Sequence, residues 1–145
     1  KEEMEAVLQK VNLLGFLQTQ DGLQTQLLEK ASNLSGGQCQ RLVIARALLK
    51  EDSKVYIFDE AASNIDVESE ELIMNVIHNL AKTKTVLLIS HRLANVVKSD
   101  KIYFLKDGEI KESGKHEELM SQNGAYSHLY ESQMALENYG KGGVA

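Results

Sequence analysis

The chain has 145 residues, a formal net charge of −5, one cysteine and no proline. This length suffices for one domain with a sizeable core, and the balance of apolar and charged residues is that of an ordinary globular protein. The net negative charge and the lack of a run of basic residues argue against a nucleic-acid partner. No apolar run is long enough to span a bilayer. The single cysteine, Cys39, excludes an internal disulfide and fits a reducing compartment.

The N-terminal part is predicted to be helical and then irregular. Apolar residues recur at helical spacing from Met4 to Leu14, and Gly15 is placed to end this helix. Residues 18–33 are polar, which predicts a loop with a short helix around Leu27, or a surface that meets another domain. Because the chain starts without a Met or a helix cap, we expect it to be a piece of a longer protein.

Residues 33–41, Asn-Leu-Ser-Gly-Gly-Gln-Cys-Gln-Arg, lead into an apolar helix. Ser35 suits the N-cap of this helix, and Gly36 and Gly37 would leave the first backbone N–H groups uncovered. A helix N-terminus with bare amides is a ready site for phosphate. The alternative interpretation is that the two glycines only form a turn.

The apolar run from Val55 to Phe58 precedes two acids, Asp59 and Glu60. This pattern predicts a strand buried on both faces, and open α/β sheets bind ligands at the carboxyl ends of such strands. One carboxylate can hold a hydrated Mg²⁺ beside a substrate phosphate while its neighbour orients or deprotonates water. The alternative is a strand that ends in two solvated acids.

The next elements complete a strand–helix–strand unit. Asp66 is a predicted N-cap, and the helix after it buries Ile73, Val76, Ile77 and Leu80. A second apolar strand, residues 85–90, ends before His91. A parallel crossover would put His91 at the same sheet edge as the two acids, although a lone histidine after a strand is more often structural.

The C-terminal part is predicted to contain a short helix at 93–98, a hairpin at 107–108, a helix that starts at His116 and another at 125–136. Residues 140–145 are predicted to form a flexible tail.

Taken together, these motifs resemble those of the ATP-binding-cassette (ABC) ATPases. Residues 34–38, Leu-Ser-Gly-Gly-Gln, are similar to the signature motif, and residues 55–60 are similar to the Walker B strand. The resemblance implies that Asp59 binds Mg²⁺ through water, that Glu60 is the general base, and that His91 contacts the γ-phosphate of ATP.

The resemblance also implies partners. Residues 62–66 are similar to the D-loop, where two ATPase domains touch, and this places Asp66 near that contact. Two such domains would face head to tail, and one domain would approach the ATP of the other with Ser35, Gly36, Gly37 and Gln38. An exporter-like transmembrane domain, fused upstream, is the second expected partner, no nucleic acid is expected, and the location would be the cytoplasmic face of the cell membrane.

The expected fold is α/β, an incomplete P-loop-NTPase-type sheet with flanking helices. Residues 1–49 would belong to a helical subdomain with the signature motif, and residues 50–139 to the C-terminal part of the ATPase core. The phosphate loop, Gly-x-x-x-x-Gly-Lys-Ser/Thr, is absent from the sequence, so we expect the central strand before it to be missing as well. The chain alone would then be inactive, and its unpaired strand edges would favour association.

Other functions stay open at this point. One is an importer-type ABC ATPase, and another is a chromosome-maintenance or DNA-repair ATPase, whose long coiled coil has no counterpart in this chain. A third is an interaction module without catalytic activity. The presence of all three of Asp59, Glu60 and His91 argues against it.

Overall fold

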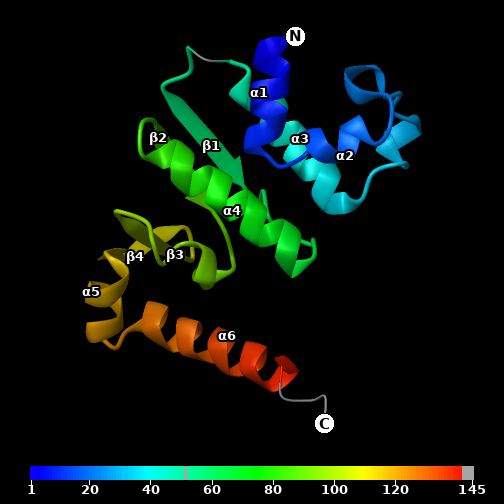
Figure 1. Cartoon of the computed structure of the whole chain (residues 1–145). Helices are drawn as coiled ribbons and strands as arrows, with labels where there is room; N and C mark the ends of the chain where they lie inside the picture. Colours follow the sequence, from blue (N-terminus) through cyan, green and yellow to red (C-terminus); the bar gives the residue numbers. More distant parts are fainter. Residues whose placement is uncertain (51, 142–145) are drawn as a thin grey trace. The chain divides into compact units, whose positions relative to one another are not determined.

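The computed structural model describes residues 1–50 and 52–141 (Figure 1). The chain is mixed α/β, as the sequence predicts, and it forms two compact units, residues 1–89 and the residues from Ser90 onward. This division differs from the expected boundary between residues 49 and 50, because apolar side chains from both sides of that point share one core. The assignment of residues 1–49 to a helical subdomain stays a prediction.

The first unit starts with short helices. They are α1 (Glu2–Lys10), α2 (Leu14–Gln18), the 3₁₀ turns η1 (Gly22–Gln24) and η2 (Glu29–Ala31), and α3 (Gly36–Leu48). The predicted end of the first helix at Gly15 is wrong. Helix α1 ends at Lys10, since Asn12 adopts a left-handed backbone with φ of 53°, which Asn tolerates better than most residues. Gly15 instead lies inside α2.

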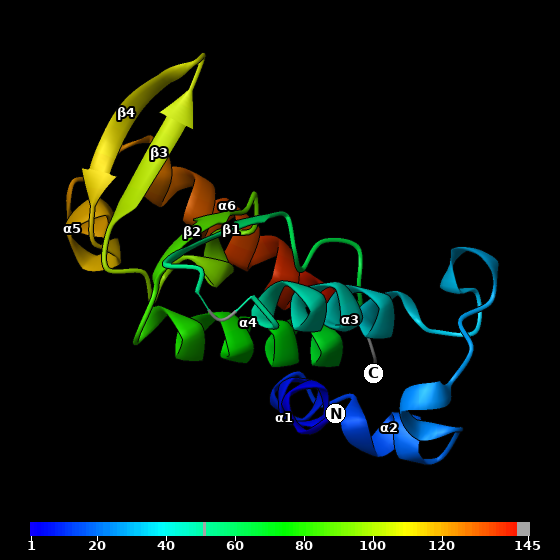
Figure 2. The same ribbon diagram turned by 90° about the horizontal axis from the view of Figure 1, so that it is seen from above.

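The second half of this unit is the predicted strand–helix–strand. Strand β1 (Val55–Asp59) is followed by α4 (Val67–Ala81) and by β2 (Thr85–Ile89). The two strands pair in parallel, with Asp59 opposite Ile89, so the predicted parallel crossover is confirmed. Helices α3 and α4 both lie on one side of the two strands in Figure 2.

This one-sided cover decides the burial of β1. Tyr56 and Phe58 are buried in the core, whereas Val55 and Ile57 are 58% and 65% exposed. Leu87 and Ile89 of β2 are exposed as well. The prediction that the strand is buried on both faces is therefore wrong: the described part of this unit covers one face of the strand pair and leaves the other apolar face open.

The second unit combines a hairpin with helices. Its elements are η3 (Leu93–Asn95), β3 (Ile102–Lys106), β4 (Glu109–Gly114), α5 (His116–Ser121) and α6 (Ala125–Lys141). The antiparallel hairpin is confirmed, and its turn residues Asp107 and Gly108 have φ of 54° and 76°, as a type I′ turn requires. The helix predicted at 93–98 is only the turn η3. Helix α6 continues to Lys141, past its predicted end, and residues 142–145 of the predicted tail lie outside the described residues.

The start of α6 is the packing centre of the second unit. Tyr126 is fully buried, its hydroxyl lies 2.8 Å from Nδ1 of His116, and its backbone N–H donates to the Glu112 carboxylate at 2.7 Å. Burial raises the pKa of the Tyr126 hydroxyl, with a smaller contribution from Tyr130. These contacts give His116 a structural role at the start of α5, where the sequence predicts a helix to begin. None of the helices in the described parts of the chain is long and apolar enough to cross a bilayer.

Candidate functional site

The end of β1 presents the two predicted acids. Asp59 is exposed and Glu60 is half-buried. Glu60 has a φ of 52°, a left-handed conformation that is uncommon for a residue with a side chain. Its backbone N–H donates to the carbonyl of Ile89 at 3.0 Å, and its own carbonyl accepts from the hydroxyl of Ser63 at 2.8 Å. The backbone is thus held on both sides of Glu60 in a strained conformation, which is common at functional sites.

The end of β1 fits a Mg²⁺ ion held by one carboxylate together with waters and substrate phosphates better than an ion held by protein ligands alone. In residues 1–50 and 52–141, no group of three or more His, Cys, Asp and Glu side chains is placed to hold a metal ion. Mg²⁺ usually keeps several waters and takes one or two carboxylates together with substrate phosphates. The exposed carboxylate of Asp59 provides one such ligand, so the residues present fit that mode of binding.

The start of α3 is closed by a capping box. The hydroxyl of Ser35 accepts from the Gln38 N–H at 3.2 Å, and the Gln38 side-chain oxygen accepts from the Ser35 N–H at 2.9 Å. Ser35 is therefore the N-cap, as predicted. The N–H groups of Gly36 and Gly37 make no hydrogen bond within the described parts of the chain, so this helix start retains the bare donors that an anion needs.

The two glycines differ in their surroundings. A Cβ at Gly37 would lie 2.1 Å from the Ser69 hydroxyl oxygen, whereas the nearest atom to a Cβ at Gly36 is a methyl of Ile65 at 3.9 Å. Gly37 is needed for the close approach of α3 to α4, which is a packing role that the sequence interpretation missed. Gly36 has no comparably close neighbour, so the space beside its backbone could be occupied by a ligand.

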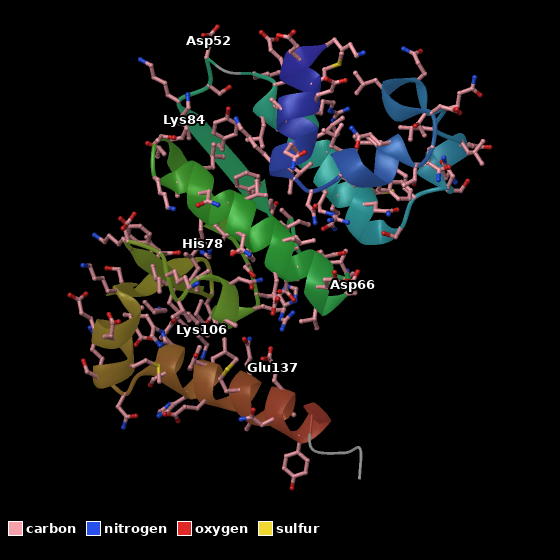
Figure 3. All side chains as sticks on the ribbon, in the orientation of Figure 1. Asp52, Asp66, His78, Lys84, Lys106 and Glu137 are labelled. Atoms are coloured by element: carbon pink, nitrogen blue, oxygen red, sulfur yellow. The ribbon has the colours of Figure 1, made fainter. Side chains whose placement is uncertain are left out.

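Asp66 lies next to this contact, at the start of α4 (Figure 3). Its carboxylate accepts from the Ser69 N–H at 2.8 Å, which confirms the predicted N-cap. Hydrogen bonds from the backbone and side chain of Ser69 are the main causes that lower the pKa of Asp66, and the positive charge of Arg41 adds a smaller effect. The structure therefore brings Asp66 and the signature residue Gly37 together.

Two residues that the sequence analysis did not single out brace this region. The buried guanidinium of Arg41 donates to the Gly37 carbonyl and to the Asn12 carbonyl, each at 3.4 Å. The side-chain amide of Gln40 donates to the Ser63 carbonyl at 3.2 Å. Gln40 thus links α3 to the loop after β1. Only their positions on one helix, three and four residues after Gly37, could have suggested these roles.

His91 belongs to the second unit, where it is exposed in the loop between β2 and η3. Its carbonyl accepts from the side-chain amide of Gln133 at 2.8 Å. The sequence analysis assigned no role to Gln133, since a contact across 42 residues leaves no local signal. The expected meeting of His91 with Asp59 and Glu60 stays a prediction.

Comparisons with known proteins agree on one family. The family model described as "ABC transporter" matches residues 1–63. The chain is 51% identical, over 94% of its length, to an ABC transporter ATP-binding protein of Haemophilus influenzae, described as uncharacterized, and covers 24% of that protein. It is 45% identical, over 91% of its length, to an ATP-dependent lipid A-core flippase of Francisella tularensis and covers 22% of it.

A solved structure gives the same result. The structure of a bacterial Atm1-family ABC exporter with ATP bound matches with a TM-score of 0.81 and 30% identity, over 92% of this chain and 23% of that one. The chain therefore spans about a quarter of the length of these proteins.

Proposed function

Since the chain belongs to the ABC transporter family and corresponds to part of its ATP-binding domain, we propose that it hydrolyses ATP within a longer protein and powers an exporter. The family membership confirms the resemblance of the sequence motifs. The observation that carries the proposal of hydrolysis is the end of β1, where the exposed Asp59 is followed by Glu60 in a strained, hydrogen-bonded backbone.

We assign separate roles to the two acids. Asp59 would hold Mg²⁺ through water, and the ion, when bound, would supply positive charge to the phosphates of ATP. Glu60 would orient the attacking water and accept its proton. Phosphoryl transfer to water depends mostly on positioning and on charge stabilisation, so a fixed backbone at Glu60 suits this role.

The start of α3 would act on an ATP bound to a second copy of the domain. The bare N–H groups of Gly36 and Gly37, together with the free donor hydrogens of Ser35 and Gln38, would bind the γ-phosphate at the helix N-terminus. Asp66, next to Gly37, would lie close to the contact between the two domains. In this arrangement hydrolysis would require that two domains close head to tail.

His91 would contact the γ-phosphate from the domain that carries Asp59. The remaining partner would be a transmembrane domain, to which closure and opening of the ATPase pair would transmit motion. The named relatives are a lipid A-core flippase and an Atm1-family exporter, which supports export as the direction of transport and the cytoplasmic face of a membrane as the location.

Replacement of Glu60 in the full-length protein tests the proposal. Glu60→Gln keeps the size of the side chain but removes its basicity, so we expect ATP hydrolysis to fall by about two to four orders of magnitude, as for loss of a general base. ATP-dependent association of two domains should persist, because Gln preserves the polar contacts.

Glu68→Gln is the matched control, since Glu68 is an exposed acid in the first turn of α4. Hydrolysis should stay at the wild-type rate in this variant. Near-normal turnover in Glu60→Gln would remove Glu60 from the proposed role.

A further inference from the structure

We propose that Gln133 of α6 is a positioning residue that fixes the backbone around His91 for its contact with phosphate. The inference rests on the proposed function, because it assigns Gln133 a role in hydrolysis only through His91. All the groups that carry it belong to the second unit.

The side chain of Gln133 forms hydrogen bonds to two backbone groups of the loop that carries His91. Its amide oxygen accepts from the Leu93 N–H at 2.9 Å, and its amide nitrogen donates to the His91 carbonyl at 2.8 Å. A backbone N–H can only donate and a carbonyl can only accept, so both bonds define one orientation of the amide. One side chain thus bridges the backbone on the two sides of residue 92.

The side chain of Ser90 holds the backbone of the same loop from its other end. The hydroxyl of Ser90 accepts from the Arg92 N–H at 3.1 Å and lies 3.2 Å from the Arg92 carbonyl, to which it can donate. A short 3₁₀ turn, η3, then follows at Leu93. The Ser90 contact is local, whereas the Gln133 contact ties the loop to a long helix.

A second tie from α6 lies one helical turn further along. The guanidinium of Arg92 forms an ion pair with the carboxylate of Glu137 at 2.7 Å, and Glu137 is labelled in Figure 3. Gln133 and Glu137 are four residues apart and therefore lie on the same face of α6. Both side chains of the pair are 36% exposed, so we expect this ion pair to contribute less than the two Gln133 hydrogen bonds.

These contacts matter because His91 itself is exposed on a loop. The position of an imidazole on a loop depends on the backbone that carries it, and misplacement of a catalytic group by about 1 Å can cost as much as 100-fold in rate. Helix α6 provides the rigid element against which this loop is fixed. The sequence between residues 91 and 133 contains no signal for the pairing, which is visible only in the structure.

The test compares variants of the full-length protein. In Gln133→Leu, which removes both hydrogen bonds at similar size, we expect kcat for ATP hydrolysis to fall about tenfold while KM for ATP changes less than about twofold. Gln133→Glu keeps an acceptor for the Leu93 N–H but places a negative charge against the His91 carbonyl, so it should also lower kcat. Glu137→Gln should reduce kcat by about twofold or less. Glu131→Gln, an exposed acid on the same helix, is the control and should match the wild type.

Two further measurements separate positioning from a general structural role. In the His91→Ala background, the additional Gln133→Leu change should cause no further loss of the residual rate, since its effect acts through His91. The amide of Leu93 should also exchange hydrogen faster in Gln133→Leu than in the wild type, while the melting temperature falls by no more than a few degrees, as expected for the loss of two hydrogen bonds.

The outcomes distinguish this inference from the proposed function. Wild-type kcat in Gln133→Leu, or the same fractional loss with and without His91, would overturn the inference and leave the role of His91 intact. Wild-type kcat in His91→Ala would remove His91 from the proposed site and the inference with it. If Glu60→Gln loses activity but His91→Ala does not, the proposed role of Glu60 stands and only the roles of His91 and Gln133 are rejected.

Discussion

The start of α3 and the β1–β2 pair lie in the same compact unit but differ in how many neighbours the described chain provides for them. The helix start has its cap from Ser35, close packing of Gly37 on Ser69, and a brace from Arg41. The strand pair has helices on one face only, and its other face exposes apolar side chains. One half of the proposed site is therefore supported from within the chain, while the strand half has an open apolar face.

The largest expected effect tests the support of the helix start. In Gly37→Ala the new methyl would collide with the side chain of Ser69, at 2.1 Å from its oxygen and 2.4 Å from its Cβ. We expect this overpacking to lower the free energy of unfolding by about 2–3 kcal/mol, as measured by urea denaturation. The additional change Ser69→Gly should restore part of the loss, because it removes both colliding atoms.

Gly36→Ala is the matched control for this prediction. A Cβ at this position meets no atom closer than 3.9 Å, and Ala favours a helix over Gly by about 1 kcal/mol. The stability should therefore stay the same or rise. Equal losses in the two variants would show that the approach of α3 to α4 is not the reason for the glycine at position 37.

The second prediction concerns the open face of the strand pair. Exposed apolar surface on paired strands favours association, so we expect the 145-residue chain to associate in a concentration-dependent manner. The double change Ile57→Thr and Leu87→Thr places β-branched side chains, which strands favour, at both positions but makes this face more polar, and it should weaken association by at least about tenfold. Sedimentation velocity at several concentrations measures the effect.

An exposed apolar residue of the second unit gives the control. Leu136 on α6 is 74% exposed, and Leu136→Thr should leave the association of the chain unchanged. A wild-type chain that stays monomeric at every concentration would show that the open face of the strand pair does not drive association.

The same contrast explains what the sequence could predict. The caps at Ser35 and Asp66 and the hairpin turn at Asp107 and Gly108 depend on residues within three positions of one another, so local patterns were sufficient. The first helix ended earlier than predicted, because the backbone at Asn12 turns before Gly15 is reached.

Long-range relations were not predictable in the same way. An apolar run such as residues 55–58 shows that the side chains favour burial, but not whether the chain supplies the layer that buries them. The bonds of Gln133 and Arg41 join backbone groups 40 and 29 residues away, and polar side chains carry no periodic signal of such partners. The candidate acids, glycines and histidine were recognised from motifs, whereas the residues that hold them in place were visible only in the structure.

The smallest expected effect is the pH dependence of the Asp66 cap. Hydrogen bonds from Ser69 lower the pKa of this carboxyl from its usual value of 3.8, so the folded state favours the charged form. The stabilisation is therefore complete above the usual pKa and is lost as the pH falls through the lowered pKa of the folded state.

Asn can also cap a helix but does not titrate, so Asp66→Asn should remove this dependence. We expect the wild type to be the more stable protein at pH 7 and the two stabilities to converge below about pH 3.8 in thermal melts, since the protonated Asp66 has lost its advantage. An unchanged difference between the two proteins across this range would mean that the charge of Asp66 does not contribute to the stability of the folded chain.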